Sequence, residues 1–274
     1  MSGYKKILFL IILIIVPAIS GSIYGFGGVL SGILISLLAG ILLILINADK
    51  VILLLYRARP AMEREFNGIN EKIRILSKKH GVPAPAVYIT DIGLPGSFII
   101  GKNIHNTLII IPKRLPVLLK NEEVDAVLAH NIVQIDNTIR KRTIAALIAG
   151  TLTMSSSVIR WGAVFTGFGD FNDPAPKLFG LFVTGLAAPP AAALIHSLPK
   201  EDYDIKALKL QDNQAALIRA ISQLESNNVT AYSSIGFLCL IDPIKENFIE
   251  QLFDVHPSKE VRIKNLASKG EKHD

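Results

Sequence analysis

The chain begins with a long apolar run, without a charged residue from Ile7 to Ala48. A transmembrane helix needs about 20 apolar residues to cross a hydrocarbon core of about 30 Å, so this run predicts two spans. Ser, Gly and Tyr residues interrupt the aliphatic pattern over Ser20–Gly28, where we expect the turn. A cleaved signal peptide is the competing interpretation, because Lys5 and Lys6 precede the run. The run is longer than the apolar core of a signal peptide, which favours the spans.

A second apolar concentration lies in the middle of the chain. Thr143–Ile159 and Leu178–Leu198 carry no formal charge, and Thr166–Pro176 between them is rich in Gly, Pro and Asp. This pattern predicts a second transmembrane pair with a short connecting loop. Pro189 and Pro190 must kink or break the second member. A buried helical hairpin or a shallow re-entrant pair remains the alternative.

Basic residues flank both apolar pairs on the same side, which predicts their orientation by the positive-inside tendency. Both termini and both polar segments are therefore expected on the cytoplasmic side of the plasma membrane. The predicted segments are paired spans over 1–48, a first domain part over 49–142, a second pair over 143–198 and a second domain part over 199–274. The flanking residues are Lys5, Lys6, Lys50, Arg57, Arg59, Arg64, Arg140, Lys141, Arg142 and Lys200.

The polar segments combine helical and strand patterns, so the two parts are expected to form one small α+β domain. The expected fold class is a mostly α membrane protein with about four transmembrane helices and this cytoplasmic domain. Apolar residues at helical or alternating spacing mark the elements. Helices are expected at Ala61–His80, Glu122–Arg140, Ala215–Leu224 and Glu260–Leu266, and strands at Ala86–Thr90, Ser97–Lys102 and Thr107–Pro112, with a hairpin turn at Asn103–Asn106.

Composition narrows the class of protein. Of 274 residues, 50% are hydrophobic and 19% are charged, and a disordered chain would be more polar. The net charge of +6 is too small, and the basic residues too dispersed, for a nucleic-acid binder. An anionic membrane surface is the partner that this charge favours. The single Cys239 excludes an intrachain disulfide and a multi-cysteine metal site.

The motif that carries chemistry is His130-Asn131-Ile132-Val133-Gln134. His130 and Gln134 share one face of the predicted helix. In zinc peptidases both of these positions are His, and a Glu directly follows the first. The spacing lets two imidazoles bind one tetrahedral zinc. The Glu takes a proton from the zinc-bound water that attacks the peptide carbonyl.

Around this motif the chain resembles the HtpX-like family of membrane-bound zinc metalloproteases, a branch that includes the CaaX prenyl proteases. The resemblance covers most of the chain and implies a zincin-like domain, a zinc cofactor and endopeptidase activity. It also implies a third, Glu ligand, which aligns with Glu201, although a slip by one or two residues places Asp202 there. The similar stretches are the paired N-terminal spans, Val87–Gly101, Asn121–His130, the two later apolar segments, Ser197–Glu201, Ala216–Ile218 and His256–Ile263.

The motif departs from the family pattern at two of its three chemical positions. Asn131 occupies the general-base position, where an amide has no suitable pKa, and loss of a general base costs ~10²–10⁴ in rate. Gln134 replaces the second His with a neutral amide oxygen, which zinc does not prefer. We therefore expect His130, Gln134 and Glu201 to be vestigial ligand positions, with no catalytic residue and no cofactor.

The leading hypothesis is a catalytically inactive HtpX-like membrane protein that binds or regulates instead of cutting. Its binding cleft is expected near Asn131, Ser97 and His256. An extended segment of a membrane or unfolded protein could be added to a strand edge within Ala86–Pro112. The sequence does not indicate an oligomeric state.

Two alternatives remain open. An active zinc endopeptidase could use His130 and Glu201 with a third ligand from Asp136, Asp202 or His256, and with Asp202 or Glu201 as the base. The second alternative is that the chain is a non-peptidase structural subunit of a membrane complex. The acidic run Asp202–Asp204 is otherwise interpreted as a solvated helix face.

Overall fold

The computed structural model describes residues 19–20, 22–62, 68–148, 192–193, 195–198, 202–226, 238–240 and 257–270. It divides the chain into two compact units, Met1–Val51 and Ile52–Asp274. The polar domain expected over 49–142 and 199–274 falls almost entirely within the second unit.

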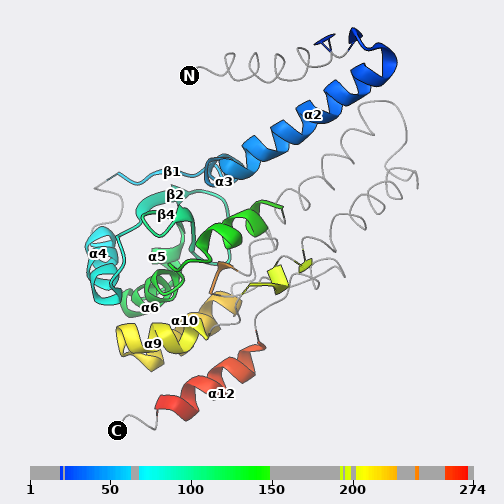
Figure 1. Ribbon diagram of the computed structural model, residues 1–274. Helices are drawn as coiled ribbons and strands as arrows, with labels where there is room; N and C mark the ends of the chain where they lie inside the picture. The colour runs from blue at the N-terminus through cyan, green and yellow to red at the C-terminus, as the bar shows by residue number, and fades with distance from the viewer. Residues whose placement is uncertain are drawn as a thin grey trace, which may run out of the picture. The chain divides into compact units, whose positions relative to one another are not determined.

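The first unit contains helix α2 (Gly25–Ile46), which is drawn in blue in Figure 1. It has 22 residues and a mean hydropathy of 2.9, and only 12% of its most apolar window is buried. Within the described residues it is the one helix long and apolar enough to cross a membrane. Gly25 has a φ of +74°, so the chain turns at the place where the sequence predicts a turn. The other three predicted spans lie mainly or wholly outside the described residues.

The second unit is built on a four-stranded mixed sheet in the order β1-β2-β4-β3. Strands β2 and β4 are parallel, whereas β1 pairs with β2 and β3 with β4 in antiparallel fashion. The Asn103 side-chain oxygen accepts hydrogen bonds from the backbone N–H groups of His105 and Asn106 at 3.0 and 2.9 Å. This contact confirms the predicted hairpin. The strands are β1 (Arg59–Pro60), β2 (Ala86–Thr90), β3 (Phe98–Asn103) and β4 (Asn106–Pro112), so three predicted strands are confirmed to within a residue.

Helix α4 (Ile69–His80) is shorter than the predicted helix over Ala61–His80. Gly68 has a φ of +88°, a left-handed conformation that no α-helix continues through. The predicted start is therefore wrong. The predicted end is confirmed, because Gly81 has a φ of +78° and its N–H reaches the carbonyl of Lys78 at 3.2 Å.

The motif helix is also shorter than predicted. Helix α6 runs over Asn121–Ile132, and a second helical stretch follows over 139–148. Between them Asp136 accepts a hydrogen bond from the Thr138 backbone N–H at 2.7 Å, a local side-chain turn that competes with the helix. A continuous helix over Glu122–Arg140 is therefore wrong, and Gln134 lies just beyond the end of α6.

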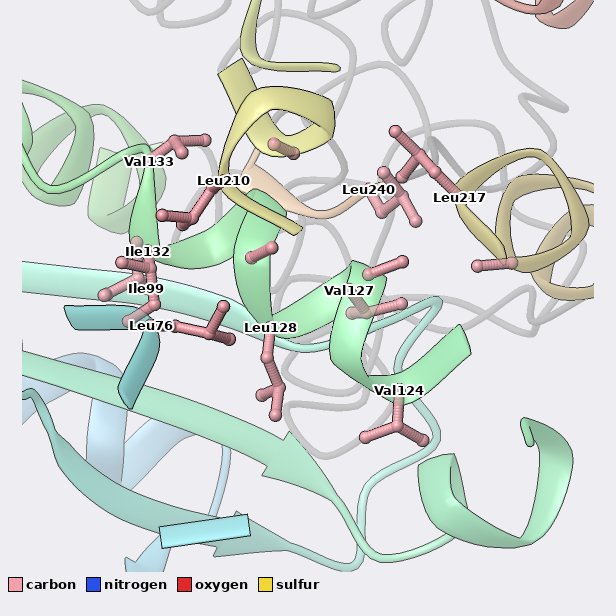
Figure 2. Close-up of a cluster of buried hydrophobic side chains, with 14 of the residues drawn as sticks. Leu76, Ile99, Val124, Val127, Leu128, Ile132, Val133, Leu210, Leu217 and Leu240 are labelled. Atoms are coloured by element: carbon pink, nitrogen blue, oxygen red, sulfur yellow. The ribbon is translucent and has the colours of Figure 1, made fainter. Parts of the chain in front are cut away.

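The core of the second unit surrounds α6, which packs against α4, against α9 (Tyr203–Gln211) and α10 (Gln214–Ser226), and against β3. Figure 2 shows side chains from these elements meeting around α6. The predicted apolar residues Val124, Val127 and Leu128 are 3%, 0% and 0% exposed. Helix α12 (Lys259–Gly270) contacts α9 and α10. Two short helices lie earlier in the chain: α5 (Leu115–Leu118) precedes α6, and α3 (Ala48–Leu55) precedes β1.

The outer edge of the sheet at β3 is covered in this structure. Phe98, Ile99 and Ile100 are all 0% exposed. Thr143 Oγ1 accepts a hydrogen bond from the Gly101 N–H at 2.8 Å and is 3.0 Å from the Gly101 carbonyl oxygen, to which the hydroxyl can donate. Thr143 thus occupies both outward backbone groups of Gly101, as a neighbouring strand would.

Candidate functional site

Helix α6 places the motif residues deep in the second unit. Its first turn is fixed by Glu123, whose carboxylate accepts a hydrogen bond from the Lys120 backbone N–H at 2.9 Å. This cap from Glu123 and the acids of the first turn favour the helix start. Near the other end of α6, His130 is 1% exposed and Asn131 is 0% exposed. The motif is therefore part of the core of the second unit.

His130 lies between an amide and a carboxylate. Its Nδ1 is 3.2 Å from Nε2 of Gln134, and its Nε2 is 3.5 Å from Oδ1 of Asp204. With the Gln134 amide nitrogen as donor, Nδ1 is an acceptor and the ring proton sits on Nε2, facing Asp204. Both ring nitrogens of His130 then have partners from the protein.

Asp204 is itself held by an arginine from the last described helix. Arg262 donates from Nε and Nη2 to the two Asp204 oxygens at 2.7 and 2.6 Å, and from Nη1 to the Leu240 carbonyl at 2.6 Å. Asp204 and Arg262 are 9% and 6% exposed. This two-point geometry is the strong form of an Arg–carboxylate pair. The interpretation of Asp204 as part of a solvated helix face is therefore wrong.

Asn131, at the position of the family's general base, is held in the core by its amide nitrogen. Nδ2 donates to Ser97 Oγ at 2.5 Å and to the Val127 carbonyl at 2.9 Å. Ser97 is also 0% exposed. The Asn131 Oδ1 atom is buried and has no hydrogen-bond partner among the described residues. Asn131 and Ser97, two residues of the expected cleft, are thus in direct contact, and the third, His256, lies outside the described residues.

A second polar cluster lies beside Gln134. Arg142 donates to the Gln134 carbonyl at 2.7 Å and pairs with Asp136 at 2.5 Å, and its guanidinium lies 5.1 Å from the centre of the Tyr203 ring. The Tyr203 hydroxyl donates to Asp136 at 3.2 Å. Arg142 is 4% exposed, so this residue, which precedes the second apolar segment, is buried among protein groups.

The electrostatics of this cluster keep Asp136 ionised. Partial burial would raise its pKa, but hydrogen bonds from Thr138 and the positive charge of Arg142 outweigh burial and hold the pKa below its ordinary value. Tyr203 connects the two clusters, because its ring is also 6.4 Å from the His130 ring, edge to face. Together the contacts fasten α9 to the end of α6.

The remaining candidate ligands of the alternative zinc centre can now be placed. The Asp202 carboxylate accepts a hydrogen bond from the Ile205 N–H at 3.2 Å and caps α9, and Asp136 is engaged by Arg142, Thr138 and Tyr203. Glu201 and His256 lie outside the described residues. Asp202 and Asp136 therefore already have structural roles.

The described donor set does not fit a zinc ion. Zinc in proteins takes imidazole, thiolate or carboxylate ligands, and the described residues contain no group of three His, Cys, Asp or Glu side chains that could hold a metal. Gln134 offers an amide, and both oxygens of Asp204 are bound by Arg262. We therefore derive no reaction step through a metal.

Sequence reasoning missed Asp204 and Arg262 as parts of this site, although a signal was present. Asp204 shares its helix face with the apolar residues Ala207 and Leu210, and Arg262 lies one turn before Leu266. A charge on an apolar face is buried only when paired. Two opposite charges, each on the apolar face of its helix, therefore predict a buried ion pair between them.

The second unit is thus a mixed α/β domain whose central helix carries a buried histidine, with the side-chain amides of Asn131 and Gln134 beside it. The sequence model of Peptidase family M48 matches residues 63–269 of this chain. A "Protease HtpX homolog" of Pelotomaculum thermopropionicum is 31% identical over 262 residues, which is 92% of this chain and 93% of that protein. The chain belongs to Peptidase family M48, and the resemblance to HtpX-like proteases is confirmed.

Other relatives carry the same name. The "Protease HtpX homolog" of Syntrophobacter fumaroxidans is 29% identical, with 93% of this chain and 97% of that protein covered. The one of Methanocaldococcus jannaschii is also 29% identical, with 80% and 81% covered. No solved structure matches this chain.

Proposed function

We propose that this chain is a non-catalytic member of Peptidase family M48 that acts at a membrane by binding rather than by cutting. One observation carries the proposal: the amide groups of Asn131 and Gln134 stand at the base and second-ligand positions and are bonded inside the protein. Asn131 Nδ2 binds Ser97 and Val127, and Gln134 Nε2 faces His130.

The chemistry of these groups supports the proposal. An amide does not accept a proton at neutral pH, so Asn131 does not replace the Glu that activates water in a zinc peptidase. His130 is the one motif residue of suitable chemistry, and its two ring nitrogens face Gln134 and Asp204. The Asp204 carboxylate beside His130 is bound at both of its oxygens by Arg262.

The expected mode of binding needs one refinement. A bound segment could pair with β3, because β3 is an edge strand of the sheet. The β3 residues Phe98–Ile100 are fully buried, and Thr143 occupies the backbone of Gly101. A segment bound at this edge therefore has to displace what covers it. We propose membrane or unfolded protein segments as the occupants, with the second unit on the cytoplasmic side.

The decisive experiment measures zinc per chain in protein purified in mild detergent without chelator. It compares the wild-type chain with His130→Ala, Glu201→Ala and, as the matched control, His105→Ala, because His105 is an exposed hairpin histidine. Cleavage of an unfolded substrate such as casein is followed in parallel, with and without added zinc.

We expect well under one zinc per chain in all four proteins and no cleavage that depends on His130. About one zinc per chain in the wild type, lost in His130→Ala but kept in His105→Ala, together with zinc-dependent cleavage, would overturn the proposal. That result would establish the alternative of an active endopeptidase with an atypical ligand set.

A further inference from the structure

Three residues far along the chain lie against the motif site. Leu238, Cys239 and Leu240 are each 0% exposed, and we call them the 238–240 strip. Leu240 belongs to the apolar cluster around α6 that is drawn in Figure 2. The strip is therefore seated inside the second unit, next to the helix that carries the motif.

The backbone of the strip is held by two side chains of the motif site. Gln134 Nε2 is 3.5 Å from the Leu238 carbonyl oxygen, and Arg262 Nη1 donates to the Leu240 carbonyl at 2.6 Å. The same two side chains surround His130. Gln134 faces its Nδ1, and Arg262 holds the carboxylate that faces its Nε2. The groups that bind the strip are thus the groups that surround His130.

The middle residue of the strip contacts the loop that leads into β3. The Cys239 Sγ atom is 3.9 Å from the Gly96 carbonyl oxygen, and a Cβ atom built on Gly96 would lie 3.9 Å from the Cβ of Cys239. Gly96 directly precedes Ser97, which accepts a hydrogen bond from Asn131. The strip therefore lies where the sequence predicts a binding cleft.

The strip is held through side chains and not by a backbone ladder. Within the described part of the chain, neither Leu238 nor Leu240 forms a hydrogen bond with the backbone of another element. The contact between Gln134 and Leu238 is at the long limit for a hydrogen bond. Proteins open locally at free energies that range from near zero to that of global unfolding. What opposes local opening of the strip is mainly the burial of its two leucines.

We propose that the 238–240 strip is an autoinhibitory segment, which occupies the binding cleft of the motif site and leaves it when a protein segment binds. The bound segment presents its own backbone carbonyls to the Gln134 amide and the Arg262 guanidinium. Recognition through the backbone does not depend on the side chains of the segment, which suits a protein that binds unfolded or membrane protein segments. The inference rests on the proposed function and supplies its regulation.

The first test asks whether the strip opens without global unfolding. The rate at which iodoacetamide modifies Cys239 is measured in the full chain in mild detergent, at urea concentrations below the unfolding transition. Cys239 is the single cysteine of the chain and is buried, so it reacts in an open state. The matched control is Val127→Cys with Cys239→Ala, because Val127 is a fully buried residue of α6. Each rate is referred to the global stability of its own protein.

We expect Cys239 to react at least about a hundredfold faster than the control cysteine, and with a shallower dependence on urea, because the strip opens while α6 stays folded. Equal rates with equally steep dependence on urea would overturn the proposal, since the strip would then be released only by global unfolding.

The second test fixes the strip in the cleft. The distance of 3.9 Å between the two Cβ positions lies within the range of about 3.5–4.5 Å found in disulfides, so Gly96→Cys can be oxidised to a disulfide with Cys239. The probe is fluorescein-labelled lactalbumin, reduced and carboxymethylated so that it is unfolded and has no thiol. Its binding is measured by fluorescence anisotropy after oxidation and again after reduction with dithiothreitol. Gly96→Ala, treated in the same way, is the matched control.

We expect oxidation to weaken binding of the probe by Gly96→Cys at least about tenfold, because the cleft is then held in its closed state. Reduction should restore binding, and neither treatment should change Gly96→Ala. Equal binding by oxidised and reduced Gly96→Cys would overturn the proposal. If neither variant binds the probe in any form, the proposed function is contradicted, and the reaction rates of Cys239 separately decide whether the strip opens.

Discussion

The side-chain amide nitrogen of Gln134 lies 3.2 Å from Nδ1 of His130, at the position where a zinc peptidase has its second histidine. The two residues therefore form a hydrogen-bonded pair within the core. His130 therefore keeps a defined orientation without a metal, since Asp204 faces its other ring nitrogen.

Removing this amide should destabilise the second unit. Gln134→Leu leaves His130 Nδ1 buried without its donor, and we expect a loss of about 1–2 kcal/mol in the free energy of unfolding. Gln211→Leu is the matched control, because the exposed Gln211 donates to the Glu122 carbonyl at 3.0 Å. That variant should change stability by less than about 0.5 kcal/mol. The measurement is urea unfolding in detergent followed by circular dichroism, and equal effects of the two variants would contradict the prediction.

The free energy of unfolding should fall more when one residue of the buried pair Asp204–Arg262 is replaced than when both are replaced. Arg262→Met leaves the Asp204 carboxylate uncompensated, and we expect a loss of about 3–5 kcal/mol. The double variant Asp204→Asn/Arg262→Met should recover part of this loss, because no buried charge remains.

The exposed pair of Lys113 and Asp91, 2.7 Å apart, supplies the control for this cycle. Lys113→Met should cost at most about 1 kcal/mol. If the two single substitutions at Asp204 and Arg262 simply add in the double variant, the two residues do not act as a pair.

The Asp136 carboxyl should make stability depend on pH in the acid range. Its pKa lies below the ordinary value of 3.8 in the folded protein. Its contribution to stability is therefore fully present above that value and is lost as the pH falls through the lowered pKa. We expect the stability advantage of the wild type over Asp136→Asn to be constant from pH 7 to about 5 and to decline below about 4. Unfolding midpoints of both proteins between pH 7 and 2.5 measure this difference, and an advantage that persists unchanged to pH 2.5 would refute the prediction.

The hairpin between β3 and β4 should not tolerate a side chain at Gly101. A Cβ atom there would lie 2.7 Å from the Asn106 carbonyl oxygen and 3.0 Å from Thr107 Cγ2. Since the nearest of these is backbone, we expect Gly101→Ala to cost about 1–3 kcal/mol. At Gly96 the nearest atoms to a new Cβ are 3.9 Å away, so Gly96→Ala should cost less than about 1 kcal/mol. Thermal unfolding of the two variants compares them directly, and similar midpoints would contradict this account.

Most local elements could be predicted from the sequence, because their signals are local. Short apolar runs bounded by Gly, Pro and Asn indicated β2, β3 and β4, and Gly81 indicated the end of α4. The start of α4 and the end of α6 were missed for one reason: a single residue overrides the helical pattern. Gly68 adopts a positive φ, and Asp136 binds the backbone of Thr138.

Only the motif residues of the candidate site could be predicted from the sequence. The spacing of His130, Asn131 and Gln134 identified the motif, and the two amides are where it departs from the family pattern. Asp204, which faces His130, comes from α9, and Arg262, which holds Asp204, comes from α12, so no local pattern places them. Arg142 shows the same limit, since a basic residue beside an apolar segment gives no local sign that it is buried and paired with Asp136.

The pairing of Asp204 with Arg262 also sets an order of events during synthesis. The two residues are separated by 58 positions, which a ribosome translates in about 3–12 s at about 5–20 residues per second. Throughout that interval α9 has no guanidinium for its carboxylate, so docking α9 on α6 would bury an uncompensated charge. We therefore expect α9 to dock stably on α6 only after Arg262 has been synthesised.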